Sequence, residues 1–387
     1  MTRTTGTTER ITVHGDEVAA FIPYPLPPKD PPVDLSGPLA EQLAEAENAL
    51  IRLDFTGDMV PALDWLASAF VRKEAVASSQ IEGVEATLVD LLRFECGETP
   101  APSPDVEEVV NCIIALGTAR EALSGGEGAP LSVKLLNEAH RRLMHGARGA
   151  EKAPGEVRDV QNWIGGARPA EAAFVPPPPY ALPDLLGDLE AYMRAQDDLP
   201  PLVRAGLVHV QFETIHPYRD GNGRIGRLLI TLLLAHWGLL AQPLLYLSQY
   251  FRRHRPAYYQ RLRAVAADGD WEGWLGFFLD GVATIADEAV GSANALFALV
   301  GADRERVLSR RGMSVAAIRL FETLPRHPIV TVNSAVQRLE TTKPTASRAI
   351  DLLVAAGVLA ETTGKRRDRW FGYGDYLDHL RAGTELG

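Results

Sequence analysis

Residues 216–227 read HPYRDGNGRIGR, and the interpretation of the whole chain starts from this stretch. Two apolar helical patterns flank it, one over Leu202–Thr214 and the other over Gly223–Trp237. The tetrapeptide Asp-Gly-Asn-Gly strongly favours a turn. We therefore expect one helix to end near Thr214 and place His216 in a loop, and a second helix to begin at the glycines.

Such a loop suits chemistry on phosphates. Glycines let backbone N–H groups converge at a helix N-terminus, which favours an anion, and Arg224 and Arg227 share one helix face as phosphate donors. Asp220 can hold a hard cation, and His216 can take a proton from a hydroxyl. The alternative is a buried histidine beside surface arginines. Seven fitting positions in twelve residues favour phosphoryl or nucleotidyl transfer instead.

A family signature matches this stretch. The sequence resembles the motif HxFx[DE]GNGRxxR of the Fic (filamentation induced by cAMP) family and departs from it only at Tyr218, where the family usually has phenylalanine. The resemblance extends over roughly Leu39–Val300. It implies a helical Fic fold and a nucleotidyltransferase that uses ATP and Mg²⁺. The enzyme would move AMP onto a tyrosine, threonine or serine hydroxyl of a target protein or of itself.

The resemblance also implies roles for single residues. His216 is similar to the base that deprotonates the target hydroxyl, Asp220 to the Mg²⁺ ligand, and Arg227 to the arginine that pairs with the γ-phosphate. The remaining phosphate-cradle positions are Gly221, Asn222, Gly223 and Arg224. The positions of the family's adenine pocket are Tyr246, Tyr250, Tyr258 and Leu262. For these four residues, ordinary core packing is an equal alternative.

A shorter motif lies upstream. Residues 78–83 read SSQIEG and match the family's inhibitory motif [ST]xxxE[GN], with Ser78, Glu82 and Gly83 at the defined positions. Glu82 is expected to pair with Arg227 and to compete with the γ-phosphate, although a helical glutamate is usually a solvated charge. In some family members the same glutamate supports removal of AMP, so the sequence leaves both directions open.

One segment breaks the helical rhythm. Between Gly155 and Pro179, apolar residues flank a Gly-Gly turn, and we expect a β-hairpin that lies against another element. Residues 160–174 resemble the family's flap, which holds the target chain by strand-like main-chain pairing. The docking residues that the resemblance implies are Val160, Trp163, Ile164, Gly165 and Phe174.

The chain as a whole is predicted to be mainly α, with a Fic-type helical core, a β-hairpin flap and a C-terminal winged helix-turn-helix. The expected parts are a proline-rich N-terminal arm (1–38), an N-terminal helical region with the inhibitory helix (39–125), the catalytic core with a helical extension (126–300) and the winged unit (313–387). Thr345–Ala355 is the candidate recognition helix. The basic residues of this unit are Lys343, Arg348, Lys365, Arg366, Arg367 and Arg369. DNA binding is one interpretation, and a unit that docks proteins or supports a homodimer is favoured over it.

Composition limits the remaining possibilities. The 387 residues carry a formal net charge of −11, so overall attraction does not hold the protein on nucleic acid or a membrane. The most apolar run, Leu228–Leu240, is too short to span a bilayer, and we expect a cytoplasmic protein with no membrane partner. Cys96 and Cys112 are interpreted as buried reduced thiols. Other functions left open are a regulator with the Fic core as sensor, and transfer of UMP, phosphocholine or phosphate.

Overall fold

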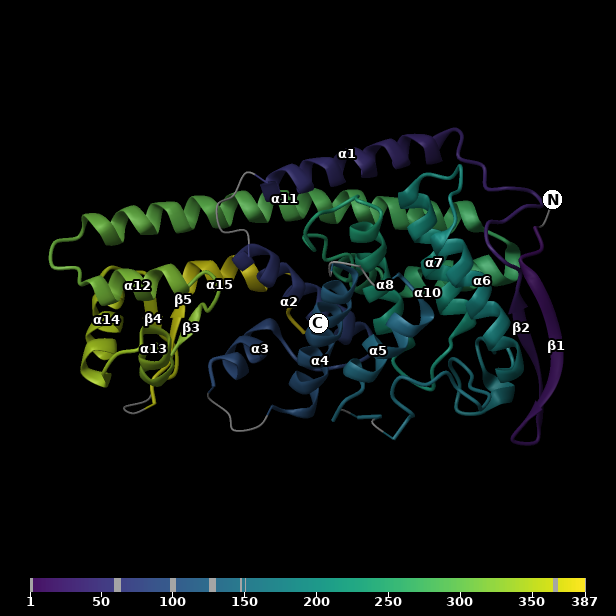
Figure 1. The fold of residues 1–387 in the computed structure, drawn as a ribbon, viewed down its shortest axis with the longest axis horizontal. Helices are drawn as coiled ribbons and strands as arrows, with labels where there is room; N and C mark the ends of the chain where they lie inside the picture. Colours follow the sequence, from purple (N-terminus) through teal and green to yellow (C-terminus); the bar gives the residue numbers. More distant parts are fainter. Residues whose placement is uncertain are drawn as a thin grey trace.

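The computed structural model describes residues 3–58, 64–97, 102–124, 130–146, 148–149, 151–364 and 368–386. Helices dominate these residues, as the sequence predicts, and Figure 1 shows them gathered along one long helix, α11 (Trp271–Ser309). The helix α1 (Pro38–Asp58) lies alongside α11 and turns its leucines and alanines inward. Together these two helices form a support against which shorter helices pack.

The central body consists of helices that bury their apolar faces in one continuous core. They are α2 (Asp64–Ile81), α3 (Leu88–Glu95), α4 (Pro104–Ser124), α5 (Val133–Leu143), α6 (Leu182–Arg194), α7 (Pro201–Ile215), α8 (Asn222–His236), α9 (Ser248–Arg253) and α10 (Arg255–Asp268), with the 3₁₀ helices η1 (Pro169–Glu171) and η2 (Pro179–Ala181). Helices α7 and α8 pack against each other, and α8 also contacts α2, α4 and α5. The loop between α7 and α8 therefore lies in the middle of the body.

Most predicted helices are confirmed within a few residues, and the break between α7 and α8 falls at the predicted place. The helix α3 begins at Leu88, because Thr87 and Asp90 form a capping box that fixes its start. The helix α2 continues to Ile81, so the motif residue Ser78 lies in its last turn. The sequence pattern misses α9, since six residues are too few to display a helical period.

The N-terminal segment is not only the predicted extended arm. Strand β1 (Gly6–Val13) pairs with the antiparallel strand β2 (Asp16–Pro23). Their turn, His14-Gly15, has positive φ at both residues, as a tight two-residue hairpin requires. The proline-rich residues 24–37 form neither helix nor regular strand, as expected, and contact α7 at Tyr24, where the Gln211 side chain donates to the Tyr24 carbonyl at 3.0 Å.

The predicted flap is not a regular hairpin either. Its two arms meet at a single bridge, in which the Ile164 N–H donates to the Phe174 carbonyl at 2.9 Å. The connection between them holds two glycines and η1, so it cannot make the tight turn that a longer ladder needs. The flap does lie against another element, as expected, because the Phe21 N–H of β2 donates to the Val175 carbonyl at 2.9 Å.

The C-terminal unit has the predicted order of three helices and a β-hairpin. The helices α12 (Val315–Thr323), α13 (Val332–Leu339) and α14 (Lys343–Ala355) are followed by a sheet in the order β3 (Ile329–Val330), β5 (Phe371–Tyr373), β4 (Leu359–Glu361). The sequence analysis misses β3 and a last helix, α15 (Gly374–Arg381), which packs on α2, α3 and α11. Three residues of the predicted basic set, Lys365, Arg366 and Arg367, lie outside the described residues.

The helix α11 is the one helix in the described ranges that is long and apolar enough to cross a membrane by length and composition. Core helices meet the same criterion. In this fold α11 packs against α1, α7, α9 and α10. Its length is therefore explained by its place as a support of the helical body.

Candidate active site

His216 stands directly after α7 in a left-handed conformation, with φ at 49°. Its N–H donates to the Phe212 carbonyl at 2.9 Å and so closes the helix. The buried Arg158 holds the following loop, with its Nε 2.8 Å from the His216 carbonyl oxygen and its main-chain N 2.9 Å from that of Pro217. These contacts fix a backbone conformation that is unfavourable for a non-glycine residue.

The start of α8 is fixed by side chains of the same loop. The Asn222 side chain accepts from the Tyr218 N–H and donates to the Tyr218 carbonyl, both at 2.8 Å. The Tyr218 ring stacks on His140 with 3.9 Å between ring centroids, so tyrosine provides the aromatic anchor of this loop. Gly221 brings no capping side chain to α8, and the N–H groups of a first helical turn lack intrahelical partners. This terminus can therefore receive an anion.

A cavity of about 590 Å³ opens beside this turn, which is a volume typical of small-molecule sites. The end of α2, the flap, the end of α7, the start of α8 and α10 form its walls. Its polar lining residues are Glu82, Glu213, Thr214, His216, Arg227, Arg255 and Arg263. The others are Trp163, Ile164, Gly165, Ala173, Phe174, Gly223, Tyr258, Tyr259, Leu262 and Ala266.

The His216 imidazole is neutral. Its Nδ1 lies 3.3 Å from the Glu213 carbonyl oxygen, which can only accept, so Nδ1 carries the proton and Nε2 keeps a lone pair. Burial, and then the charge of Arg158, lower the pKa of His216 to about 4. At pH 7 the ring is thus unprotonated at Nε2 and can accept a proton from a group in the cavity.

Arg227 is a buried cation that the end of α2 holds. Its Nη2 lies 2.7 Å from Glu82 Oε1 and its Nε lies 2.9 Å from Ser78 Oγ, so the predicted pair with Glu82 is confirmed as a contact. Glu82 follows the last residue of α2, in a turn that Gly83 completes with φ at 88°. Burial lowers the pKa of Arg227, but the attraction of Glu82 outweighs it and raises the pKa overall. The guanidinium therefore stays charged.

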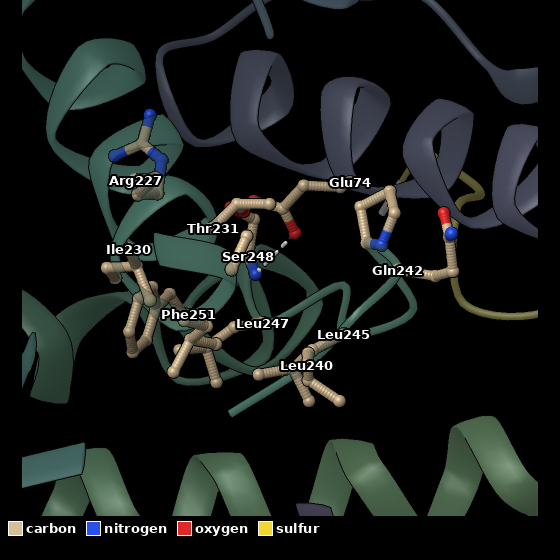
Figure 2. A pocket seen from close by; sticks show the side chains of 13 residues that line it. Glu74, Arg227, Ile230, Thr231, Leu240, Gln242, Leu245, Leu247, Ser248 and Phe251 are labelled. Carbon is tan, nitrogen blue, oxygen red and sulfur yellow. Dashed lines mark hydrogen bonds between the residues drawn. The ribbon is translucent and has the colours of Figure 1, made fainter. Parts of the chain in front are cut away.

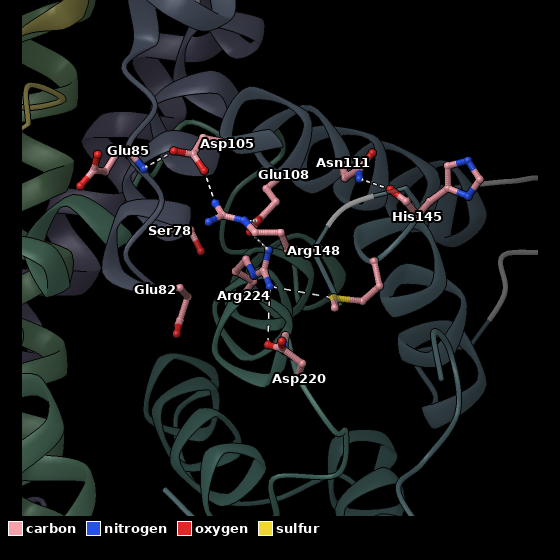
Figure 3. A network of polar contacts seen from close by, with 12 residues as sticks. Ser78, Glu82, Glu85, Asp105, Glu108, Asn111, His145, Arg148, Asp220 and Arg224 are labelled. Atoms are coloured by element: carbon pink, nitrogen blue, oxygen red, sulfur yellow. Dashed lines mark hydrogen bonds and ion pairs between the residues drawn. The ribbon is translucent and has the colours of Figure 1, made fainter. Parts of the chain in front are cut away.

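Arg224 does not line the cavity, and its predicted place in the phosphate cradle stays a prediction. Its Nη1 lies 2.8 Å from Glu108 of α4, a buried carboxylate that also accepts from Arg148 at 2.9 Å (Figure 3). A buried carboxylate needs a cation beside it, and Arg224 is the buried one. Glu108 on α4 and Glu82 after α2 thus engage the two arginines of one helix from different sides.

Asp220 is the acidic residue nearest to the start of α8. Its side chain is 49% exposed, and its Oδ1 accepts from the Gly221 N–H at 2.6 Å. Within the described residues, no group of three or more histidine, cysteine or acidic side chains is placed to hold a metal ion. Mg²⁺ usually takes one or two carboxylates together with substrate phosphates. The donor set at Asp220 therefore fits Mg²⁺ when a nucleotide supplies the other ligands.

Glu213 is a cavity residue that the sequence analysis missed. It lies on α7 one turn before His216, and a glutamate at that spacing shares the face of the signature histidine. That spacing is the signal by which it could have been found. Burial raises the pKa of Glu213 to about 7, with the nearby Arg227 acting in the opposite direction.

Two of the four predicted adenine-pocket residues, Tyr258 and Leu262, line the cavity. Tyr246 and Tyr250 do not, and this corrects their assignment. Tyr246 packs edge-on against Phe70 in the core, and the Tyr250 hydroxyl is bonded within the body. The ordinary-core alternative holds for both, because the chain that enters α9 turns them toward α2 and α11.

The flap contributes most of its predicted docking residues to the cavity wall. Trp163, Ile164, Gly165 and Phe174 line it. Val160 does not, because its side chain is exposed, and its carbonyl accepts from Arg158 at 3.1 Å. The N-terminal hairpin braces the flap through the His14 ring, which lies edge-on to Trp163 at 5.8 Å.

A second cavity, of about 10 Å³, lies on the other side of Arg227 (Figure 2). Glu74 borders it and accepts from the Ser248 N–H at 2.9 Å. This volume is close to that of a single water. It cannot hold a nucleotide, so the larger cavity is the candidate site.

Residues 130–234 match the model of the Fic/DOC family, and residues 40–121 match the model of the Fic/DOC family N-terminal region. The chain therefore contains a Fic/DOC segment and a Fic/DOC N-terminal segment. The first match contains His216 and Arg227, and the second contains Glu82. The ion pair of Glu82 and Arg227 therefore joins the two segments that match the family models.

Parts of this chain are similar in sequence to curated protein adenylyltransferases. A probable protein adenylyltransferase of Aquifex aeolicus is 41% identical over 69 residues, which are 18% of this chain and 22% of that protein. Protein adenylyltransferase Fic of Culex quinquefasciatus is 33% identical over 152 residues, 39% of this chain and 27% of the relative. The corresponding Drosophila virilis protein is 29% identical over 245 residues, or 60% and 47% of the two chains. This chain thus spans less than half the length of the curated relatives that it matches.

Solved structures share the fold. A Fic family protein of Desulfovibrio desulfuricans is similar with a TM-score of 0.58 and 20% identity, over 89% of this chain and 98% of that one. Fic-1 of Caenorhabditis elegans is similar with a TM-score of 0.52 and 21% identity, over 66% and 74% of the two chains. The Fic fold therefore includes the helices that surround the candidate site.

Proposed function

We propose that the protein is an adenylyltransferase that moves AMP from ATP onto a hydroxyl side chain of a protein. The observation that carries the proposal is a single cavity that joins the neutral His216, the first turn of α8 and Arg227. These are a proton acceptor, an anion-binding helix terminus and a cation for a terminal phosphate. The names of the relatives, which are protein adenylyltransferases, support the same reaction.

In this proposal the polyphosphate of ATP lies on the N-terminus of α8, with Arg227 toward its γ-phosphate. Asp220 would hold Mg²⁺, which when bound neutralises charge on the phosphates. The base would lie toward Tyr258 and Leu262 on the opposite wall of the cavity. His216 would then be close to the α-phosphate.

The chemical step is a substitution at the α-phosphorus. His216 Nε2 takes the proton of the target hydroxyl, and the hydroxyl oxygen forms a bond to the α-phosphorus. The bond from that phosphorus to the bridging oxygen of the β-phosphate breaks, and pyrophosphate leaves. The exposed edge of the flap near Ile164 would hold the target main chain in register during this step.

Glu82 restrains the reaction in our proposal. Arg227 already bonds Glu82 and Ser78, so a γ-phosphate must displace the Glu82 carboxylate before it can use this arginine. A nucleotide that cannot do so would be shifted along the cavity, and its α-phosphate would miss the line of attack. Withdrawal of the turn at residues 82–83 would release the site.

Intact-mass analysis of the Glu82→Gly protein after incubation with ATP and Mg²⁺ tests the proposed function. We expect a mass increment equal to AMP, because the protein offers its own hydroxyl groups. His216→Ala in the same background should abolish the increment, since loss of a general base costs roughly 10²- to 10⁴-fold in rate. Another increment, or full labelling without His216, would refute the reaction or the role of His216.

A second candidate function is removal of AMP. The Glu82 carboxylate is 33% exposed and lines the same cavity as His216, so it is placed to orient a water molecule there. An AMP-modified target incubated with wild-type protein would lose AMP in this case. The Glu82→Gly variant would leave the modified target intact.

For the C-terminal unit we propose a role in docking a protein partner, with DNA binding through a winged helix as the alternative. Lys343, Arg348 and Arg369 are exposed, but they belong to an acidic chain. A gel-shift with the protein's own promoter decides between the two. Binding that is lost on Arg348→Ala would favour DNA.

A further inference from the structure

Glu213 is the one acidic side chain of the cavity lining that has no counter-charge in contact. Its neighbour Glu82 is paired with Arg227 at 2.7 Å. Glu213 Oε1, by contrast, is buried and has no hydrogen-bond partner within the described part of the chain. Leaving a buried polar atom without a partner costs about 1–3 kcal/mol, more for a charged group. A ligand donor that reaches the carboxylate from the cavity would offset that cost.

Two glycines of α8 make room for the two carboxylates. A Cβ at Gly223 would lie 2.3 Å from Glu82 Oε1, and a Cβ at Gly226 would lie 2.2 Å from Glu213 Oε1. Any other residue at either position would push the carboxylate away from the helix. The carboxylates therefore lie against consecutive parts of α8, with Glu82 nearer its N-terminus and Glu213 further along.

The groups that share the cavity with Glu213 limit what it can meet. The N-terminus of α8 is the proposed anion site, and Tyr258 of the cavity lining is an aromatic residue that the base can contact. In ATP the hydrogen-bond donors are the two ribose hydroxyls and the amine of the base, because the phosphates are acceptors only. The ribose joins the phosphates to the base, so it falls beside Glu213.

We propose that Glu213 is a ribose-binding residue that accepts hydrogen bonds from the 2′- and 3′-hydroxyls of the nucleotide and so selects ribonucleotides over deoxyribonucleotides. This inference rests on the proposed function, since it assumes that ATP occupies the cavity. A carboxylate has two oxygens and no donor, and this matches a vicinal diol. The single glutamate would discriminate by the bonds it loses when a hydroxyl is absent.

The test is nucleotide binding by calorimetry in the Glu82→Gly, His216→Ala background, where no transfer consumes the ligand. The probes are ATP, 2′-deoxy-ATP, 3′-deoxy-ATP and the analogue that lacks the base amine, each with Mg²⁺. We expect ATP to bind at least about tenfold more tightly than either deoxy compound, because a hydrogen bond to a charged group contributes about 1.5–3 kcal/mol. Adding Glu213→Ala should bring both ratios close to one.

Glu213→Gln keeps the side-chain volume and one acceptor oxygen and replaces Glu213→Ala if that variant does not fold. It should lower the ratios without abolishing binding. Unchanged ratios in both variants would overturn the inference while leaving the proposed function intact. A change confined to the analogue without the amine would place Glu213 at the base and also overturn it. If ATP itself does not bind the background protein, the proposed function fails, and the inference fails with it.

Discussion

The first turns of α8 and α14 are alike in sequence terms and different in the folded protein. Both helices begin without a side-chain cap, and both carry two basic residues near their start. In α8 these are Arg224 and Arg227, which are buried and paired with carboxylates from other elements. In α14 they are Lys343 and Arg348, which are exposed to solvent.

Under the proposed function, this difference in burial distinguishes a basic helix start that binds a ligand from one that does not. A buried arginine must keep a carboxylate beside it, and an incoming phosphate can replace that carboxylate. Exposed lysines and arginines are already solvated, and their attraction for a partner is weakened by salt. In the proposed function the start of α8 is therefore switched by exchange of an anion, whereas the start of α14 offers only a charged surface.

Glu82→Gly should give the largest effect, because it removes the carboxylate that competes for Arg227. We expect AMP transfer to rise by roughly 10- to 100-fold, the equivalent of one hydrogen bond to a charged group at 1.5–3 kcal/mol. Incorporation of labelled AMP from ATP, at saturating nucleotide, measures it. Glu85→Ala is the matched control, since this exposed glutamate follows the same turn, while the ion pair of Arg227 is made with Glu82. Equal labelling of wild type and Glu82→Gly would show that the Glu82 carboxylate does not restrain AMP transfer.

Glu213→Gln tests the unpaired carboxylate of α7, which packs against α8. Its pKa is raised from 4.5 to about 7 in the folded protein, so ionised Glu213 destabilises the fold above that range. Stability from this group is fully present below pH 4.5 and lost as pH rises through 7. We expect Glu213→Gln to raise the free energy of unfolding by roughly 1–3 kcal/mol at pH 8 and to have little effect at pH 4. Urea unfolding at the two pH values measures this, and an equal gain at both would contradict it.

The α7–α8 loop could be predicted from sequence because its determinants are local. Glycines set the turn, and the helical patterns on either side set the distance between His216 and Arg227. The contact of Glu82 with Arg227 could be predicted because Glu82 lies in the inhibitory motif and Arg227 lies in the family signature. The partner of Arg224 could not, since Glu108 lies 116 positions away on a helix with no motif of its own.

The other misses have the same cause. Which way Tyr246 and Tyr250 turn depends on how the chain enters α9 against α2, and no local period records that packing. Glu213 carries no motif position, and its spacing of one turn from His216 gains weight once the cavity is seen around both residues. The N-terminal hairpin is the exception, because alternating residues around His14-Gly15 offered a local signal that the prolines after it obscured.

The last described residues of the C-terminal unit contact the end of α2, just before the turn that holds Glu82. Arg252 of α9 donates to the carbonyls of Gly383 and Glu385, at 2.6 and 2.7 Å, and to the Gln80 side chain of α2 at 2.6 Å. Gln80 also donates to the Thr384 carbonyl at 3.0 Å. These bonds hold the end of α2 two residues before Glu82.

Arg252→Ala should therefore loosen that end and give a smaller rise in AMP transfer, roughly two- to tenfold, because the charged hydrogen bonds of this guanidinium hold Gln80 and not Glu82 itself. Arg348→Ala is the matched control, an exposed arginine of the same C-terminal unit that does not contact α2, and it should leave transfer unchanged. Both variants are measured beside wild type by incorporation of labelled AMP. A rise with Arg252→Ala alone would show that the C-terminal unit acts on α8 through a defined contact. A rise of the same size with both variants would mean that any disturbance of the C-terminal unit suffices. No change with either variant would mean that the C-terminal unit does not influence AMP transfer through α2 or through the start of α14.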